Sequence, residues 1–209
     1  MAVMTRSPET SDSLLLSVRD TDDRAAWDRF VAIYRPMVYR IGRRAGLQDS
    51  DAEDLAQRVM ISVAGAIPDW EKDPHQGGFR GWLNRIARNA LISMLRSRKL
   101  SEANGVIGKG GLPKQLLSPE ASDDEIDRII RQEHHRSRLR WAAEQVRHEF
   151  TQPTWRAFWL TTLGEVSVPD AAEQLQISVG SVYAARSRIM RKLQELARDS
   201  DLFNAEDCL

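Results

Sequence analysis

The sequence predicts an all-α protein made of two small helical domains joined by a flexible linker. Apolar residues recur at helical spacing in nearly every long segment, and alternating β-branched runs bounded by turns are missing. Residues 102–124 are rich in glycine and proline and lack a sustained apolar period, which is typical of a linker. A length of 209 residues suits two small domains. We therefore expect an N-terminal extension that includes the start of the first helix (1–24), a first domain (25–100), a linker (101–124), a second domain with a helix-turn-helix (125–198) and an acidic tail (199–209).

Composition excludes several classes of protein. Hydrophobic residues make up 42% and charged residues 29% of the chain, which fits neither a disordered nor a membrane protein. No run approaches the ~18 apolar residues of a membrane-spanning helix, and the N-terminus lacks the apolar core of a signal peptide. We therefore expect a cytoplasmic protein without a membrane partner. The single cysteine, Cys208, excludes an internal disulfide framework and a Cys-rich zinc site.

The first domain should contain three helices. The first carries a periodic apolar stripe, and Pro36 should kink it or split it into two. The second should run from Ser50 to about Ile67, because Ser50 and Glu53 form a capping box. Prolines and glycines mark residues 68–78 as a loop, and a third helix should follow from about Phe79 to Arg98. The apolar stripe of the first helix comprises Trp27, Phe30, Val31, Tyr34, Val38 and Ile41.

The third helix is the first candidate site. Thirty basic residues balance thirty acidic ones in the whole chain, but residues 76–99 contain no Asp or Glu. Cations follow a phosphate backbone, an aromatic ring can stack on an exposed base, and an asparagine amide can pair with a base edge, so this helix suits single-stranded or melted DNA. For Trp82 alone, a plain core tryptophan is the preferred interpretation. A helical wheel places Phe79, Trp82, Leu83, Ile86, Ala90 and Met94 inward. The neighbouring basic stripe comprises Arg85, Arg88, Asn89, Ile92, Arg96 and Lys99.

The helix from Ser50 to Ile67 is a candidate docking surface for another protein. It should bury Leu55, Val59, Val63 and Ile67. Its opposite, polar face contains one aliphatic residue, Ile61, which is a plausible centre for docking, although single exposed aliphatic residues are common. The other members of this face are Asp51, Asp54, Gln57 and Arg58.

The C-terminal segment has the spacing of a helix-turn-helix. Ser167 can cap a short helix with Pro169 in its first turn, and Ser178 can cap the next helix. Ala172, Gln176 and Val182 stand where the motif needs a small residue, a tight turn and an apolar contact, although glycine is the easier residue for the turn. The second helix should present cations and small residues outward, as a recognition helix in the major groove does. A packing hairpin with a solvated basic face is the alternative.

Three segments, in this order and spacing, resemble the signature segments of bacterial RNA polymerase sigma factors of the extracytoplasmic-function group. They are DAEDLAQRVMISV (51–63), FRGWLNRIARNALISMLRSRK (79–99) and VPDAAEQLQISVGSVYAARSRIMRKL (168–193). The resemblance implies a subunit that binds core polymerase and directs promoter-specific initiation. It melts the minus-ten element and reads the minus-thirty-five element. The short linker leaves no room for the middle domain of larger sigma factors.

The resemblance also implies roles for individual residues. The clamp of the largest polymerase subunit would bind Asp51, Asp54, Gln57, Arg58 and Ile61. The melted strand of the minus-ten element would bind Gly77, Gly78, Arg80, Trp82, Arg85, Arg88, Asn89 and Arg96, and Asn89 matches the family asparagine. The minus-thirty-five element would bind Ser178, Ser181, Tyr183, Ala184, Arg186, Ser187, Arg188 and Arg191. An anti-sigma factor is a candidate further partner.

The recognition helix departs from the family pattern. Tyr183, Ala184 and Ala185 replace more usual polar or basic residues, and Arg186 stands where an apolar residue is more usual, whereas Arg188 matches a common family arginine. Individual base contacts therefore do not carry over. The alternative function is a stand-alone helix-turn-helix regulator that binds duplex DNA unaided.

An enzyme is the third class, and the sequence argues against it. Glu133, His134 and His135 are adjacent, so their side chains diverge from a helix and do not form a metal-binding pair at i, i+4. No glycine-rich phosphate loop or nucleophile elbow appears. We expect no catalytic site, no cofactor and no metal.

Overall fold

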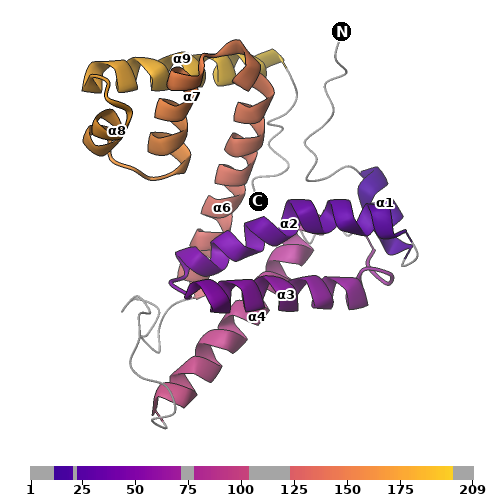
Figure 1. The fold of residues 1–209 in the computed structure, drawn as a ribbon. Coiled ribbons are helices and arrows are strands. Elements are labelled where there is room, and N and C mark those ends of the chain that lie inside the picture. Colours follow the sequence, from indigo (N-terminus) through magenta and orange to yellow (C-terminus); the bar gives the residue numbers. More distant parts are fainter. Residues whose placement is uncertain (1–11, 21–22, 72–77, 104–122, 200–209) are drawn as a thin grey trace. The chain divides into compact units, whose positions relative to one another are not determined.

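The computed structural model describes residues 12–20, 23–71, 78–103 and 123–199 (Figure 1). Every regular element in these ranges is helical, which confirms the predicted all-α class. The chain divides into two compact units, one ending at His134 and the other beginning at His135. Most of the expected linker, residues 104–122, and the expected tail from residue 200 lie outside the described residues.

Unit 1 contains α1 (Asp12–Arg19), α2 (Arg24–Arg44), α3 (Asp49–Ala66), α4 (Gly78–Ala103) and the first part of α6 (Asp123–Val146). Asp23 caps α2, since its carboxylate accepts a hydrogen bond of 2.9 Å from the backbone N–H of Ala26. α2 continues through Pro36, so the proline does not split it. The helices α2 and α3 lie side by side, and between them the Tyr39 hydroxyl donates a hydrogen bond to the Asp49 carboxylate. This bond raises the pKa of Tyr39 above its ordinary value.

The start of α3 differs from the expected capping box. The helix begins at Asp49 with Gln48 as its N-cap, and no side chain caps it. Ser50 therefore lies inside the first turn, and the Glu53 carboxylate instead pairs with Arg35 at 2.5 Å. The acidic side chains of Asp49 and Asp51 are placed to interact favourably with the positive end of the helix.

The buried stripe of α4 is rotated relative to the helical-wheel prediction. Its fully buried members are spaced four apart, whereas Trp82, Ile86, Ala90 and Met94 are only partly buried. The rotation arises because α4 is covered by more than one neighbour, including the first part of α6. The buried members of α4 are Phe79, Leu83, Ala87, Leu91 and Leu95.

The first part of α6 belongs to the core of unit 1. Ile126, Ile129 and Ile130 are 3%, 7% and 2% exposed and pack in the same apolar cluster as α2, α3 and α4. The sequence pattern predicts that these isoleucines belong to the second domain, after a boundary at residue 124. The structural division falls later, after His134.

Unit 2 contains the rest of α6, a 3-10 turn η3 (Arg147–Glu149), α7 (Gln152–Phe158), a π-helical turn η4 (Trp159–Leu163), α8 (Val168–Leu175) and α9 (Val179–Asp199). The predicted helix from Thr154 to Leu163 thus begins two residues earlier and ends in a π-turn before Gly164. Its core is built around Phe158 and Ile189, both fully buried.

Candidate nucleic-acid interfaces

The predicted helix-turn-helix of α8 and α9 forms in unit 2. Ser167 caps α8 by accepting a hydrogen bond of 3.2 Å from the Asp170 N–H, and Ser178 caps α9 by accepting one of 3.1 Å from the Ser181 N–H. Between them Gln176 adopts the left-handed conformation, with φ 54° and ψ 42°, which reverses the chain. Ala172 and Val182 are buried in one small core. The angle between the two helices is thus set by caps, one turn and one apolar contact.

Seven of the eight predicted contact residues lie on α9, and the eighth, Ser178, is its N-cap. Ser178, Ser181, Tyr183, Ser187, Arg188 and Arg191 are exposed, and Ala184 and Arg186 are half-buried. Tyr183 is 57% exposed, which is unusual for an aromatic ring. Opposite this face, Val182, Ala185, Ile189 and Leu193 are buried. A helix with cations, hydroxyls and an aromatic ring on one side can enter a major groove.

A second cationic face follows α4 in unit 1. Arg85, Asn89 and Arg96 are exposed and lie at i, i+4 and i+11, so they share one stripe. Arg80 is half-buried and lies on a different side of α4 from this stripe. Gly78 begins the helix at φ 57°, a conformation that favours glycine. Gly77 lies outside the described residues.

Trp82 borders this stripe as part of an aromatic cluster. Its ring centroid lies 5.4 Å from that of Phe79 and 6.1 Å from that of Trp70, and the side chain is half-buried. Most of the ring therefore packs against the protein, as the core interpretation predicted, while one part stays accessible. A partly accessible indole can cover the end of a base stack.

Arg88, another member of the predicted strand-binding set, is engaged inside unit 1. Its Nε lies 3.1 Å from the Asp127 Oδ1 of α6, and its side chain is 25% exposed. One turn earlier on α4, the Asn84 Oδ1 lies 2.5 Å from the His134 Nε2. Sequence reasoning missed both contacts, because it assigned α6 to the other domain. The helical period of Ile126, Ile129 and Ile130 continues with Glu133 and was the available signal.

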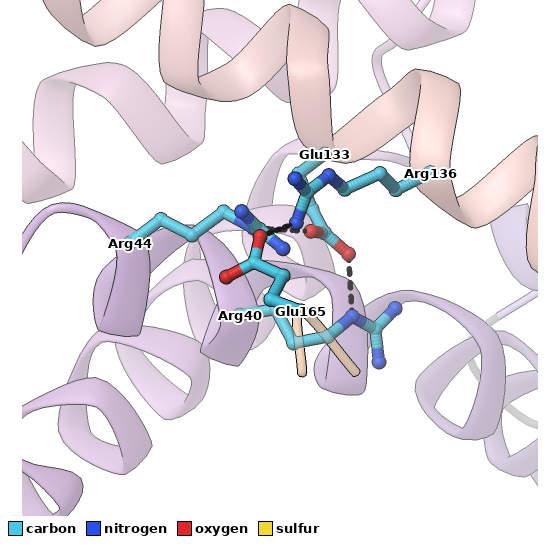
Figure 2. A network of polar contacts seen from close by, with 5 residues as sticks. All are labelled: Arg40, Arg44, Glu133, Arg136 and Glu165. Carbon is cyan, nitrogen blue, oxygen red and sulfur yellow. Dashed lines mark hydrogen bonds and ion pairs between the residues drawn. The ribbon is translucent and has the colours of Figure 1, made fainter. Parts of the chain in front are cut away.

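Glu133 anchors the same part of α6 to α2 (Figure 2). Its side chain is fully buried, its Oε2 accepts a hydrogen bond of 2.9 Å from the Arg44 Nε, and its Oε1 accepts one from the Arg40 Nε. Arg40 and Arg44 are one turn apart on α2, so the carboxylate bridges both. A buried carboxylate needs such partners to remain charged. Figure 2 also draws the ion pair between Arg136 and Glu165 within unit 2.

The outer face of α3 carries the predicted docking residues. Asp54, Gln57, Arg58 and Ile61 are exposed, and Asp51 is half-buried. Ile61 is 64% exposed, and the other exposed large hydrophobic residues of the described ranges are Leu16, Val179 and Tyr183. On the opposite side, Leu55, Val59 and Val63 are buried, as predicted. This face is available to a partner.

Neither a metal centre nor a membrane span is found in the part of the chain that the structure describes. No group of three or more His, Cys, Asp or Glu residues there has a geometry that would hold a metal ion. None of the helices there is both long and apolar enough to cross a bilayer.

Known proteins share these segments. The family model for sigma-70 region 2 matches residues 30–100, which include α3 and most of α4. The extracytoplasmic-function RNA polymerase sigma factor SigE of Mycolicibacterium smegmatis is 32% identical over 180 residues, which are 84% of this chain and 63% of SigE. The chain thus spans less than two thirds of SigE. The sigma factor RpoE of Cereibacter sphaeroides is 26% identical over 200 residues, which cover 92% of this chain and 97% of RpoE. A solved structure of CnrH in complex with the cytosolic domain of CnrY is 20% identical and has a TM-score of 0.36, covering 93% of this chain and 99% of CnrH.

Proposed function

Because this chain belongs to the extracytoplasmic-function group of the sigma-70 family, we propose that it is an RNA polymerase sigma factor that binds core polymerase and directs initiation at particular promoters. The chain has no reaction of its own in this proposal, since polymerase performs the catalysis. In this proposal the protein acts in the cytoplasm, where core polymerase and promoter DNA are found. An anti-sigma factor as a further partner stays a prediction.

We divide the work between the two units. In unit 1, the outer face of α3 docks on the clamp of the largest polymerase subunit, and the stripe on α4 captures the melted strand of the minus-ten element. In unit 2, the outer face of α9 enters the major groove of the minus-thirty-five element. The functional regions in this proposal are those expected from the sequence, except that the first part of α6, up to His134, belongs with unit 1.

The observation that carries the proposal is the presence of two different nucleic-acid faces in one chain. The stripe on α4 combines cations, an amide and a neighbouring indole, which suits unpaired bases. The face on α9 follows a capped helix-turn-helix, which suits intact duplex. A stand-alone regulator needs only the second face, whereas promoter opening needs both.

Transcription with purified core polymerase tests the proposal. A library of genomic fragments should yield discrete transcripts with core plus this chain, and none of these with core alone. The chain without core should show little specific binding to the same fragments. If it instead shifts its target duplex unaided and starts no RNA with core, it is a stand-alone helix-turn-helix regulator.

The docking face can be tested by one double variant. Asp54→Ala with Ile61→Ser removes one charge and the exposed aliphatic centre of the outer face of α3. We expect affinity for core to fall about 30-fold, because central interface residues contribute ~2 kcal/mol or more. The matched control, Asp28→Ala with Leu16→Ser, changes an exposed acid and a 65% exposed aliphatic elsewhere in unit 1. Equal core affinity of both double variants would refute the assignment of α3.

A single variant tests the groove-reading face. Arg188→Ala should weaken discrimination of the upstream element by about 1–3 kcal/mol, the range for one arginine contact with a base, and leave core binding unchanged. Arg198→Ala, on an exposed position of the same helix, is the control. Competition between matched and mutated promoters in the presence of core measures the effect. Loss of core affinity in Arg188→Ala would show that the two faces do not have separate roles.

A further inference from the structure

The first part of α6 lies against the strand-binding helix α4. Two contacts hold the pair together, Arg88 with Asp127 at 3.1 Å and Asn84 with His134 at 2.5 Å. Residue numbers rise along α4 while they fall along α6, so the two helices run antiparallel at this contact. Asn84 and Arg88 are one turn apart on α4, so α6 contacts this helix at two successive turns, beside the cationic stripe.

Buried groups attach the first part of α6 to unit 1. Ile126, Ile129 and Ile130 are buried in the core of unit 1, and the fully buried Glu133 bridges Arg40 and Arg44. Moving the isoleucines out of the core would expose apolar surface. Separating Glu133 from its arginines would leave a buried charge without a counter-charge. These buried groups therefore hold the first part of α6 on unit 1.

Asp127 differs from these anchors because water reaches it. Its side chain is 40% exposed and that of Arg88 is 25% exposed, so the pair is partly hydrated, although the Arg88 Nε itself is buried. A phosphate of a DNA strand offers the same kind of acceptor to a guanidinium as a carboxylate does. Arg88 lies three residues after the exposed Arg85, a spacing that makes the two neighbours on the helix surface, so a strand bound along the stripe can reach the ion pair.

We propose that Asp127 acts as an internal competitor of DNA: it occupies Arg88 with a carboxylate that a strand phosphate must displace, and so lowers the affinity of α4 for single-stranded DNA. The exchange occurs at the side chain, while the buried anchors hold α6 in position. This inference rests on the proposed function, in which α4 binds the melted strand. It adds that Asp127 weakens the binding of this strand.

The test compares two variants with equal loss of charge. Asp127→Asn removes the competing charge with little change of shape, and Asp124→Asn removes an exposed acid one turn earlier on α6. We measure binding of the full chain, with core polymerase present, to a short fluorescein-labelled single-stranded oligodeoxynucleotide by fluorescence anisotropy. The Asp127 variant should bind about two- to fivefold more tightly than the natural chain, the range that an exposed ion pair provides. The Asp124 variant should change affinity much less.

A second background separates competition from a general effect of charge. In Arg88→Gln, the oligonucleotide should bind more weakly, and adding Asp127→Asn should give no gain. Equal affinities of the Asp127 and Asp124 variants, or a gain that persists without Arg88, would overturn the inference and leave the proposed function intact. If core with the natural chain binds no oligonucleotide and starts no RNA, the proposed function itself fails, and this inference fails with it. Thermal melting of each variant checks that the fold is retained.

Discussion

The bridge from Glu133 to Arg40 and Arg44 should be a major source of stability in unit 1. Glu133 is fully buried, while the side chains of Arg40 and Arg44 keep 29% and 22% of their exposure. Removing one partner of a fully buried ion pair costs about 3–5 kcal/mol. Because both guanidinium groups remain partly hydrated, we expect Glu133→Gln to lower the free energy of unfolding of unit 1 by about 2–3 kcal/mol.

Glu125→Gln is the matched control, because it makes the same chemical change on the same helix. Glu125 is paired with Arg128 three residues later, at the protein surface, and the hydrogen bond from Arg128 lowers the pKa of Glu125. Exposed pairs of this kind are hydrated and contribute little to stability. A third variant, Glu133→Leu with Arg40→Met and Arg44→Leu, replaces the polar bridge by apolar side chains. It should recover most of the loss, since buried ion pairs are often no more stable than apolar packing.

Hydrogen exchange is the suitable assay, since the two units need not unfold together. Peptides from α2 and the first part of α6 should lose protection by about 30-fold or more in Glu133→Gln, because 1.36 kcal/mol corresponds to a factor of ten. Peptides from α8 and α9 should be unchanged. Equal protection in Glu133→Gln and Glu125→Gln would refute the view that the buried bridge holds α6 on unit 1.

Further substitutions test the backbone in both units. Gly42→Ala should lower stability by about 0.5–1 kcal/mol, because the new Cβ would lie 3.2 Å from the Ala52 Cα and α3 would have to move. Gly65→Ala should instead raise stability by about 0.5–1 kcal/mol, because nothing lies within 4 Å of the added Cβ. If both substitutions changed the free energy of unfolding in the same direction, the packing argument would be wrong. Gln176→Gly should stabilise unit 2 by about 0.5 kcal/mol in thermal melting, because it relieves the positive φ of 54°, and a lower melting temperature would refute this.

The helix-turn-helix shows how much the sequence could predict. Ser167, Gln176 and Ser178 act locally, through caps and a turn within a few residues, so their spacing was enough to predict the shape. Single-helix patterns also predicted which side of α9 and which side of α3 would be exposed. The roles of these exposed residues stay proposals.

The contacts of α6 show what could not be predicted. Asp127 and Glu133 reach Arg88, Arg40 and Arg44, which are far away in the sequence, across a glycine-rich segment that suggested a domain boundary. Composition marks where a chain lacks local order, but it does not say which core the next helix joins. The capping box at Ser50 failed for a related reason, because Glu53 found a distant partner in Arg35.

The continuity of α6 affects how this protein can be shortened. A cut in the glycine-rich segment looks natural, yet a fragment ending there would lack three isoleucines and a carboxylate that fill the interior of its own half. Such a fragment would expose apolar surface and two arginines without their counter-charge, and so tend to aggregate. Shortened proteins that keep the N-terminal half should therefore extend through His134, even though this includes the opening turns of a helix that continues into the other half.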